Sequence, residues 1–218
     1  MPTILAYGDS ITWGSSPEVG VTLPVARHPV SHRWPDVLAA QLGDGFDVIN
    51  HGLRGRTTAY DEHLSDSDRN GVRLLPTVLY THAPIDLVVI MLGSNDMKPN
   101  ICGTALGAMH GMRRLMNIAL NHTQGTTPPT NAKVLIVAPP PLCESDEPEF
   151  AAMFEGGIEQ SKKLAALYEG VAAEKGCGFF DAGSVAKTDP RDGVHLDAEN
   201  TRNIGLALAP KVRAMMIN

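Results

Sequence analysis

The sequence is short of cysteine and of basic residues, and each shortage excludes a class of protein. Only three of the 218 residues are cysteines, Cys102, Cys143 and Cys177, and none stands in a Cys-x-x-Cys spacing. This excludes a full disulfide framework and the usual zinc motifs, so reduced thiols in the cytoplasm are expected. Eighteen basic against 24 acidic residues give a net charge of −6, which offers no electrostatic reason to bind nucleic acid or an anionic membrane.

Long apolar runs are also missing. No run approaches the roughly 18 residues that a membrane helix needs, and the N-terminus has no basic segment typical of a signal peptide. We therefore expect a cytoplasmic protein with no membrane partner. The composition, 43% hydrophobic and 19% charged, nevertheless supplies enough apolar material for a packed core. At this length we expect one domain that spans residues 1–218.

Short apolar runs rich in β-branched residues alternate with segments of helical period. The runs cover residues 3–7, 46–50, 86–92, 133–138 and 178–181, and the helical segments cover 34–42, 74–80, 106–120, 150–174 and 198–216. The third and fourth runs hardly alternate in polarity, which is typical of strands covered on both faces. This order predicts an α/β fold, a three-layer α/β/α sandwich around a five-stranded parallel sheet.

Polar groups follow the predicted strands at the edge where such sheets bind their ligands. Ser10 follows the first run within Gly8-Asp9-Ser10-Ile11-Thr12, Gly52 follows the second run, and Asn95 follows the third. Taken singly, each fits a turn or a helix cap. A serine hydroxyl is also a nucleophile, however, and a glycine N–H and an asparagine side chain are suitable donors to an oxyanion.

A histidine near the C-terminus completes this set of groups. Asp192 stands three residues before His195, so its carboxylate can accept the Nδ1 proton and leave Nε2 free to act as a base. Asp197 is expected to cap the last helix. Together the strand ends supply a nucleophile, a base, an orienting acid and oxyanion donors, a combination that favours an acyl-transferring site.

Several other catalytic and binding motifs are absent from the sequence. Thr12 stands where the second glycine of a Gly-x-Ser-x-Gly nucleophile elbow would be. The chain has neither a phosphate-binding Gly-x-x-x-x-Gly-Lys loop nor a Gly-x-Gly-x-x-Gly fingerprint after a strand. His28 and His32 are four residues apart, but they lie in a proline-rich segment without a nearby cysteine. We expect these two histidines to be solvated loop residues, and we expect no metal.

The four blocks resemble those of the SGNH-hydrolase superfamily, also called GDSL esterases and lipases, which centre on Ser, Gly, Asn and His. They occur in order from Gly8 to His195, and longer strings look like the bacterial arylesterase and acyltransferase branch: Gly8–Gly14, Arg56–Thr58, Val89–Asp96, Phe154–Gly157 and Phe180–Ser184. The resemblance implies a flavodoxin-like domain, a homo-oligomer that needs no cofactor. It also implies hydrolysis of small esters, with acyl transfer to alcohols or peroxide in some members.

The resemblance also assigns roles to individual residues. It implies that Ser10 is the nucleophile, His195 the general base and Asp192 its orienting partner. The oxyanion hole would consist of the backbone N–H groups of Ser10 and Gly52 together with the side chain of Asn95. The second block departs from the commoner form because Arg54 stands where a serine is frequent.

The residues of the substrate pocket are less closely defined by the sequence. We expect Asp9, Trp13 and Phe154 to line it, although Trp13 would equally suit a core anchor for the first helix. The Phe154–Gly157 string interrupts a helical pattern, which fits a kink as well as a subunit contact. Two other functions remain open: a carbohydrate O-deacetylase with the same triad, and a flavodoxin-like binding module without turnover.

Overall fold

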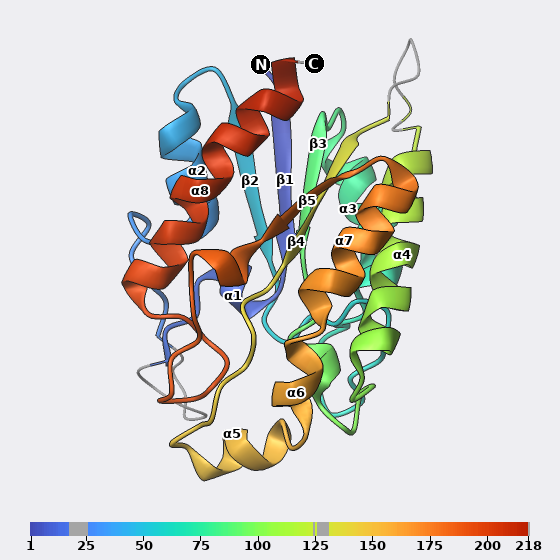
Figure 1. Ribbon diagram of the computed structural model, residues 1–218. Helices are drawn as coiled ribbons and strands as arrows, with labels where there is room; N and C mark the ends of the chain where they lie inside the picture. Colours follow the sequence, from blue (N-terminus) through green and yellow to red (C-terminus); the bar gives the residue numbers. More distant parts are fainter. Residues whose placement is uncertain (18–25, 124, 126–130, 218) are drawn as a thin grey trace.

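The computed structural model describes residues 1–17, 26–123, 125 and 131–217 (Figure 1). Five parallel strands form one sheet in the order β2-β1-β3-β4-β5. The strands are β1 (Thr3–Gly8), β2 (Asp47–Gly52), β3 (Leu87–Met91), β4 (Lys133–Ala138) and β5 (Gly178–Asp181). This confirms the predicted five-stranded parallel sheet.

Helices cover both faces of the sheet and complete the three predicted layers. Figure 1 shows α2 (Trp34–Leu42) and α8 (Ala198–Ile217) on one face. On the other face lie α3 (Gly71–His82), α4 (Ala105–Asn121) and α7 (Leu164–Lys175). Every residue of β3 is buried, as the unbroken apolar run predicts for a strand covered on both sides.

Each face of the sheet packs against its helices through a separate apolar cluster. Trp34 and Leu38 of α2 pack with Leu208 of α8 against one face of the sheet, and Trp34 is fully buried as predicted. Gly205 allows this close contact between α2 and α8, because a Cβ there would lie 2.6 Å from the carbonyl oxygen of Trp34. On the other face, the predicted methionine stripe of α4, including Met112, forms part of the second cluster.

The segment 150–174, predicted to be helical, is divided into three. It contains α5 (Pro148–Met153), α6 (Gly157–Ser161) and α7, so the interruption expected at Phe154–Gly157 is present and a second break follows it. The first break falls within the Phe154–Gly157 string, where Gly156 adopts a left-handed conformation with φ of 74°. A glycine takes this conformation without the steric cost that a side chain would add, so the string ends α5 and redirects the chain.

Three short helical turns follow strands within a few residues and set the geometry of the sheet edge. They are α1 (Ser10–Trp13) after β1, η2 (Asn95–Met97) beyond the end of β3, and η3 (Ala182–Ser184) after β5. The expected loops at 15–31 and 124–131 lie partly outside the described residues. In the described part of the chain, no helix combines the length and the apolar character needed to cross a membrane.

Candidate active site

Ser10 is the first residue of α1, immediately beyond the end of β1. Asp9 caps this helix, because its side chain accepts a hydrogen bond of 2.9 Å from the N–H of Ile11. The tight exit from the strand requires Gly8, where a Cβ would lie 1.9 Å from Thr12 Oγ1 and 2.8 Å from the carbonyl oxygen of Met91. Ser10 itself is 6% exposed, so its hydroxyl is held at the sheet edge with little freedom.

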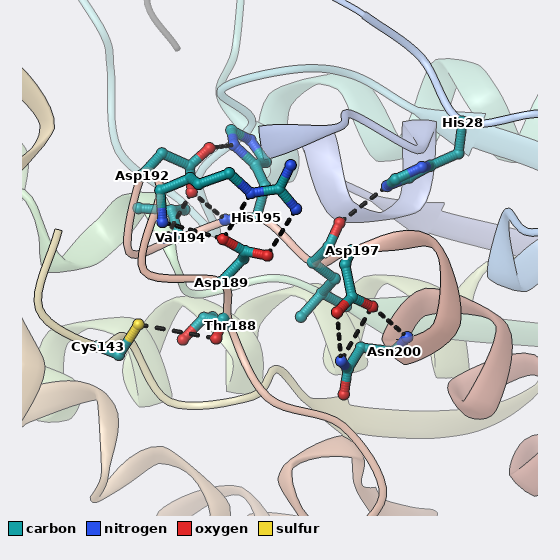
Figure 2. Close-up of polar contacts among 11 residues, drawn as sticks. His28, Cys143, Thr188, Asp189, Asp192, Val194, His195, Asp197 and Asn200 are labelled. Atoms are coloured by element: carbon teal, nitrogen blue, oxygen red, sulfur yellow. Dashed lines mark hydrogen bonds and ion pairs between the residues drawn. The ribbon is translucent and has the colours of Figure 1, made fainter. Parts of the chain in front are cut away.

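Hydrogen bonds connect Ser10 with His195 and Asp192. The Ser10 Oγ lies 2.8 Å from His195 Nε2, although the two residues are 185 positions apart in the sequence. On the other side of the ring, His195 Nδ1 lies 2.6 Å from Asp192 Oδ2 (Figure 2). A carboxylate only accepts hydrogen bonds, so Nδ1 carries the proton and Nε2 is free to accept one from the serine hydroxyl.

Asp192 is held in place by its own chain. Its Oδ1 accepts the backbone N–H groups of Val194 (2.9 Å) and His195 (2.8 Å). Burial would raise the pKa of Asp192, but the hydrogen bonds and charge of His195, with the backbone donors, hold this pKa below its usual value. The carboxylate is therefore ionised at neutral pH. Asp197 accepts the N–H of Asn200 at 2.7 Å, as expected of a cap for α8.

Gly52 and Asn95 lie at the same edge of the sheet as Ser10. Gly52 ends β2 opposite Gly8, and a Cβ at Gly52 would lie 2.1 Å from the backbone nitrogen of Trp13 in α1. Its N–H donates to Asn50 Oδ1 at 3.2 Å. Both Gly52 and Asn95 therefore lie beside α1, the helix of Ser10. Gly52 packs against Trp13 of this helix, and Asn95 contacts Asp9, which caps it.

The amide of Asn95 is oriented by two acceptors. Its Nδ2 donates to the carbonyl oxygen of Arg56 at 3.2 Å and to Asp9 Oδ2 at 3.4 Å. Asp9 is only 1% exposed, and burial raises its pKa to about 6 against the opposing effects of the Ile11 N–H and the charge of His195. The side chain of Asp9 is taken up by contacts within the protein. It supports Ser10 and Asn95 from inside, and it does not form the pocket wall that we expected.

Two cavities flank the serine and the histidine. One, of about 450 Å³, is lined by Trp13 and Gly52. Trp13 is half-buried and forms part of the wall of this cavity. The other, of about 240 Å³, is lined by Phe154 and Asp192. Phe150 lines this second cavity too, and its ring meets that of His195 edge-on, with centroids 6.0 Å apart. A larger cavity of about 600 Å³ lies at the opposite end of the sheet, where β4 and β5 begin, away from these groups.

The two histidines of the proline-rich segment differ from each other. His28 is buried, and its Nε2 donates to the carbonyl oxygen of Leu196 at 2.8 Å, as the dashed line in Figure 2 shows. The expectation of a solvated loop residue is therefore wrong for His28, which ties this segment to the chain after His195. His32 contacts the hydroxyl of Ser31. Among the described residues, no three histidine, cysteine or acidic side chains form a group that could hold a metal ion.

Comparison with known proteins gives a family match over most of the chain. A family model described as the GDSL-like Lipase/Acylhydrolase family matches residues 6–201. The chain belongs to this family. The match spans every strand of the sheet except the first residues of β1, and it includes all the site residues described above. The comparison with curated proteins found no match.

Solved structures of the GDSL-like family resemble the chain over its whole length. A carbohydrate acetylesterase family member from Sinorhizobium meliloti is 57% identical, with a TM-score of 0.95 and 100% of both chains covered. A second carbohydrate acetylesterase from the same organism and the native aryl esterase of M. smegmatis are each 42% identical. Both have a TM-score of 0.93, and the match covers 99% of this chain and 100% of theirs. These homologous structures are thus named as carboxylic ester hydrolases.

Two buried charged residues of this GDSL-family chain were not identified as site residues from the sequence. Arg56 is 1% exposed, and its guanidinium donates to the carbonyl oxygens of Gly8 (2.8 Å) and His51 (2.6 Å), which ties the ends of β1 and β2 together. Asp96 is fully buried and accepts the N–H and the hydroxyl of Thr58. Burial raises the pKa of Asp96 to about 6. Only the position of Asp96 beside Asn95 hinted at such a role.

Proposed function

We propose that this GDSL-family chain is a serine esterase that hydrolyses small carboxylic esters through Ser10, His195 and Asp192. The observation that carries the proposal is the continuous hydrogen-bonded series from Ser10 Oγ through the His195 ring to Asp192. The names of the similar structures, acetylesterase and aryl esterase, support the reaction class. We also propose that residues 1–218 act as one domain.

The first half of the reaction follows from the protonation state of the site. His195 Nε2 takes the proton of Ser10 as Oγ attacks the carbonyl carbon of the ester. The carbonyl oxygen becomes an oxyanion, which the N–H groups of Ser10 and Gly52 and the Asn95 amide stabilise. The N–H of Gly52 exchanges its bond with Asn50 for one with the oxyanion, and the Asn95 amide likewise exchanges its longer bond, with Asp9 at 3.4 Å. His195 then returns the proton to the departing alcohol, and the acyl group stays on Ser10.

The second half repeats these steps with a different nucleophile. His195 removes a proton from water, the hydroxide attacks the acyl carbon, and Ser10 recovers its proton as the acid leaves. An alcohol or peroxide in the place of water would take the acyl group instead, so hydrolysis and acyl transfer share one intermediate. Throughout the cycle, ionised Asp192 stabilises the imidazolium form of His195.

The proposal is tested by labelling and turnover of the same variants. Wild-type protein should form one covalent adduct with a fluorophosphonate, located on Ser10 by peptide mass analysis, and should hydrolyse p-nitrophenyl acetate. Ser10→Ala should lose both properties. Ser184→Ala, which removes an exposed hydroxyl beyond β5, should keep both. Absence of labelling and turnover in the wild type would favour the binding module over an enzyme.

A carbohydrate O-deacetylase is the second candidate. It is favoured by the names of the two Sinorhizobium meliloti structures, which are carbohydrate acetylesterases. The chemistry at Ser10 would be the same, so only the substrate separates the two functions. A panel of aryl acetates, short alkyl acetates and acetylated sugars, compared by kcat/KM, distinguishes them: a preference of tenfold or more for acetylated sugars would assign the deacetylase.

A further inference from the structure

The cavity beside Gly52 is lined by two arginine side chains, Arg54 and Arg69, that have no role in the proposed reaction. Its lining is formed by residues from three segments: Trp13, Gly52, Leu53, Arg54, Asp66, Ser67 and Arg69. It shares Gly52 with the proposed oxyanion hole and Trp13 with the helix of Ser10. A substrate whose ester carbonyl sits at Ser10 can therefore place one of its substituents in this cavity.

In the part of the chain that the structure describes, the two arginines of the cavity have no acidic partner. Within the described residues, neither Arg54 nor Arg69 forms an ion pair, and Asp66 in the same lining is not within ion-pair distance of either. The neighbouring loop carboxylate of Asp68 pairs instead with Arg73, at 2.8 Å. The Nε of Arg69 is buried and has no hydrogen-bond partner among the described residues. Two guanidinium groups thus share one cavity with their charges unpaired.

The surroundings of the two side chains differ, because Arg54 is exposed and Arg69 is partly buried. Arg69 packs over Gly55, where φ is 78° and a Cβ would lie 2.7 Å from the Nη1 of Arg69. Arg54 lies over the ring of Trp13, with its Cζ 5.7 Å from the ring centroid. Burial, followed by the charge of Arg69, lowers the pKa of Arg54, as expected for like charges that face one another. An anion between the two groups would relieve this repulsion.

We propose that the cavity is a subsite for a carboxylate carried by the ester substrate, with Arg54 and Arg69 as its ligands. This inference rests on the proposed esterase function and names its substrate class: small esters that bear a second, ionised acid group. A guanidinium group suits a carboxylate because its planar fork donates two parallel hydrogen bonds. The volume of about 450 Å³ has room for a ring or a short chain between the ester and the acid. Trp13 provides the apolar wall.

Matched pairs of esters test the subsite on either side of the ester bond. The first pair is 4-acetoxybenzoate and its neutral methyl ester, which place the charge on the alcohol side. The second pair is p-nitrophenyl hemisuccinate and its neutral methyl ester, which place the charge on the acyl side. In at least one pair, wild-type protein should prefer the anionic member by tenfold or more in kcat/KM at low salt, in spite of the net charge of −6. Added sodium chloride should reduce this preference.

Variants then locate the effect. Arg54→Met keeps an apolar stem on Trp13 and should lower the anionic-to-neutral ratio roughly 10- to 100-fold, the usual effect of losing a hydrogen bond to a charged group. Arg54→Lys should lower it less, because the charge remains without the fork. Arg113→Met is the control, since Arg113 pairs with Glu174 outside this cavity, and it should leave the ratio unchanged.

The outcomes separate this proposal from the esterase assignment. A wild-type ratio of one or less in both pairs, with the neutral esters turned over, would refute the subsite alone. An unchanged ratio in Arg54→Met would also refute it. Failure of the wild type to hydrolyse any of the four esters would refute the esterase function and the subsite together.

Discussion

The hydrogen bond between Asp192 and His195 can be tested with a nearly isosteric change, Asp192→Asn. Asp192 Oδ1 accepts two backbone N–H groups, while Oδ2 lies 2.6 Å from His195 Nδ1. In the variant, the amide oxygen retains the backbone bonds, so the NH₂ group faces Nδ1. Two donors then oppose each other unless His195 moves its proton to Nε2. In that tautomer, Nε2 cannot accept the proton of Ser10.

The expected loss follows from the absence of the base in its active form. We expect kcat to fall roughly 10³- to 10⁴-fold, which corresponds to about 4 to 5.5 kcal/mol of activation free energy. KM should change far less, because Asp192 is 1% exposed and mainly contacts its own loop. An interaction made chiefly in the transition state lowers kcat and kcat/KM together.

Steady-state kinetics with p-nitrophenyl acetate measure both parameters, and circular dichroism checks that the variant folds. Asp189→Asn is the matched control, because the Asp189 carboxylate lies 2.7 Å from Arg191. Only the backbone of Asp189 contacts His195, through an N–H that donates to the His195 carbonyl oxygen at 2.8 Å, and the substitution leaves this N–H in place. The control should keep kcat within a few-fold of wild type. An Asp192→Asn variant that is folded and retains more than a tenth of the wild-type kcat would show that Asp192 does not orient the base.

Three further predictions concern the groups around Ser10. Asn95→Ala removes one oxyanion donor and should lower kcat roughly 10²- to 10³-fold, measured on the same ester; a change below threefold would remove Asn95 from the oxyanion hole. Gly52→Ala places a Cβ 2.1 Å from the backbone of Trp13, so α1 must shift, and we expect thermal denaturation at a lower Tm together with reduced kcat. An unchanged Tm would show that α1 can shift without any loss of stability. Asp96→Asn tests the raised pKa of about 6. Because the buried carboxyl group favours its neutral form, its stabilising effect is complete below the unfolded pKa near 4 and is lost as pH rises through 6. Urea unfolding from pH 4 to 7 should therefore show wild-type stability falling by about 2.4 kcal/mol relative to the variant, and parallel curves would refute this.

The sheet and the composition of its edge could be predicted from the sequence for one physical reason. Strands covered on both faces need unbroken apolar runs, and β3 and β4 show them plainly. Once the strands are parallel, the residues after each run must meet at one edge. Ser10, Gly52 and Asn95 could therefore be grouped before any distance was known.

Features that depend on contacts between distant segments could not be predicted in the same way. The burial of Asp9 comes from the packing around α1. The ring contact between Phe150 and His195 joins two residues that are 45 positions apart in the sequence. The second break of the segment 150–174, at Lys162 and Lys163, has neither a glycine nor a side-chain cap to announce it. Arg54 was visible as a departure from the family pattern, but only the fold shows that Arg69 shares its cavity.

The distance along the chain between Ser10 and His195 also has a consequence for folding. During synthesis, Ser10 leaves the ribosome 185 residues before His195, and the helix α8 leaves after His195. The loop of His195 leads directly into α8, which packs against α2, so we expect the packing of α8 to bring the proposed base to the serine. A nascent chain would therefore carry a serine without its proposed base until His195 has emerged. In refolding experiments, the return of ester hydrolysis should time the docking of the last helix, separately from the earlier formation of the sheet.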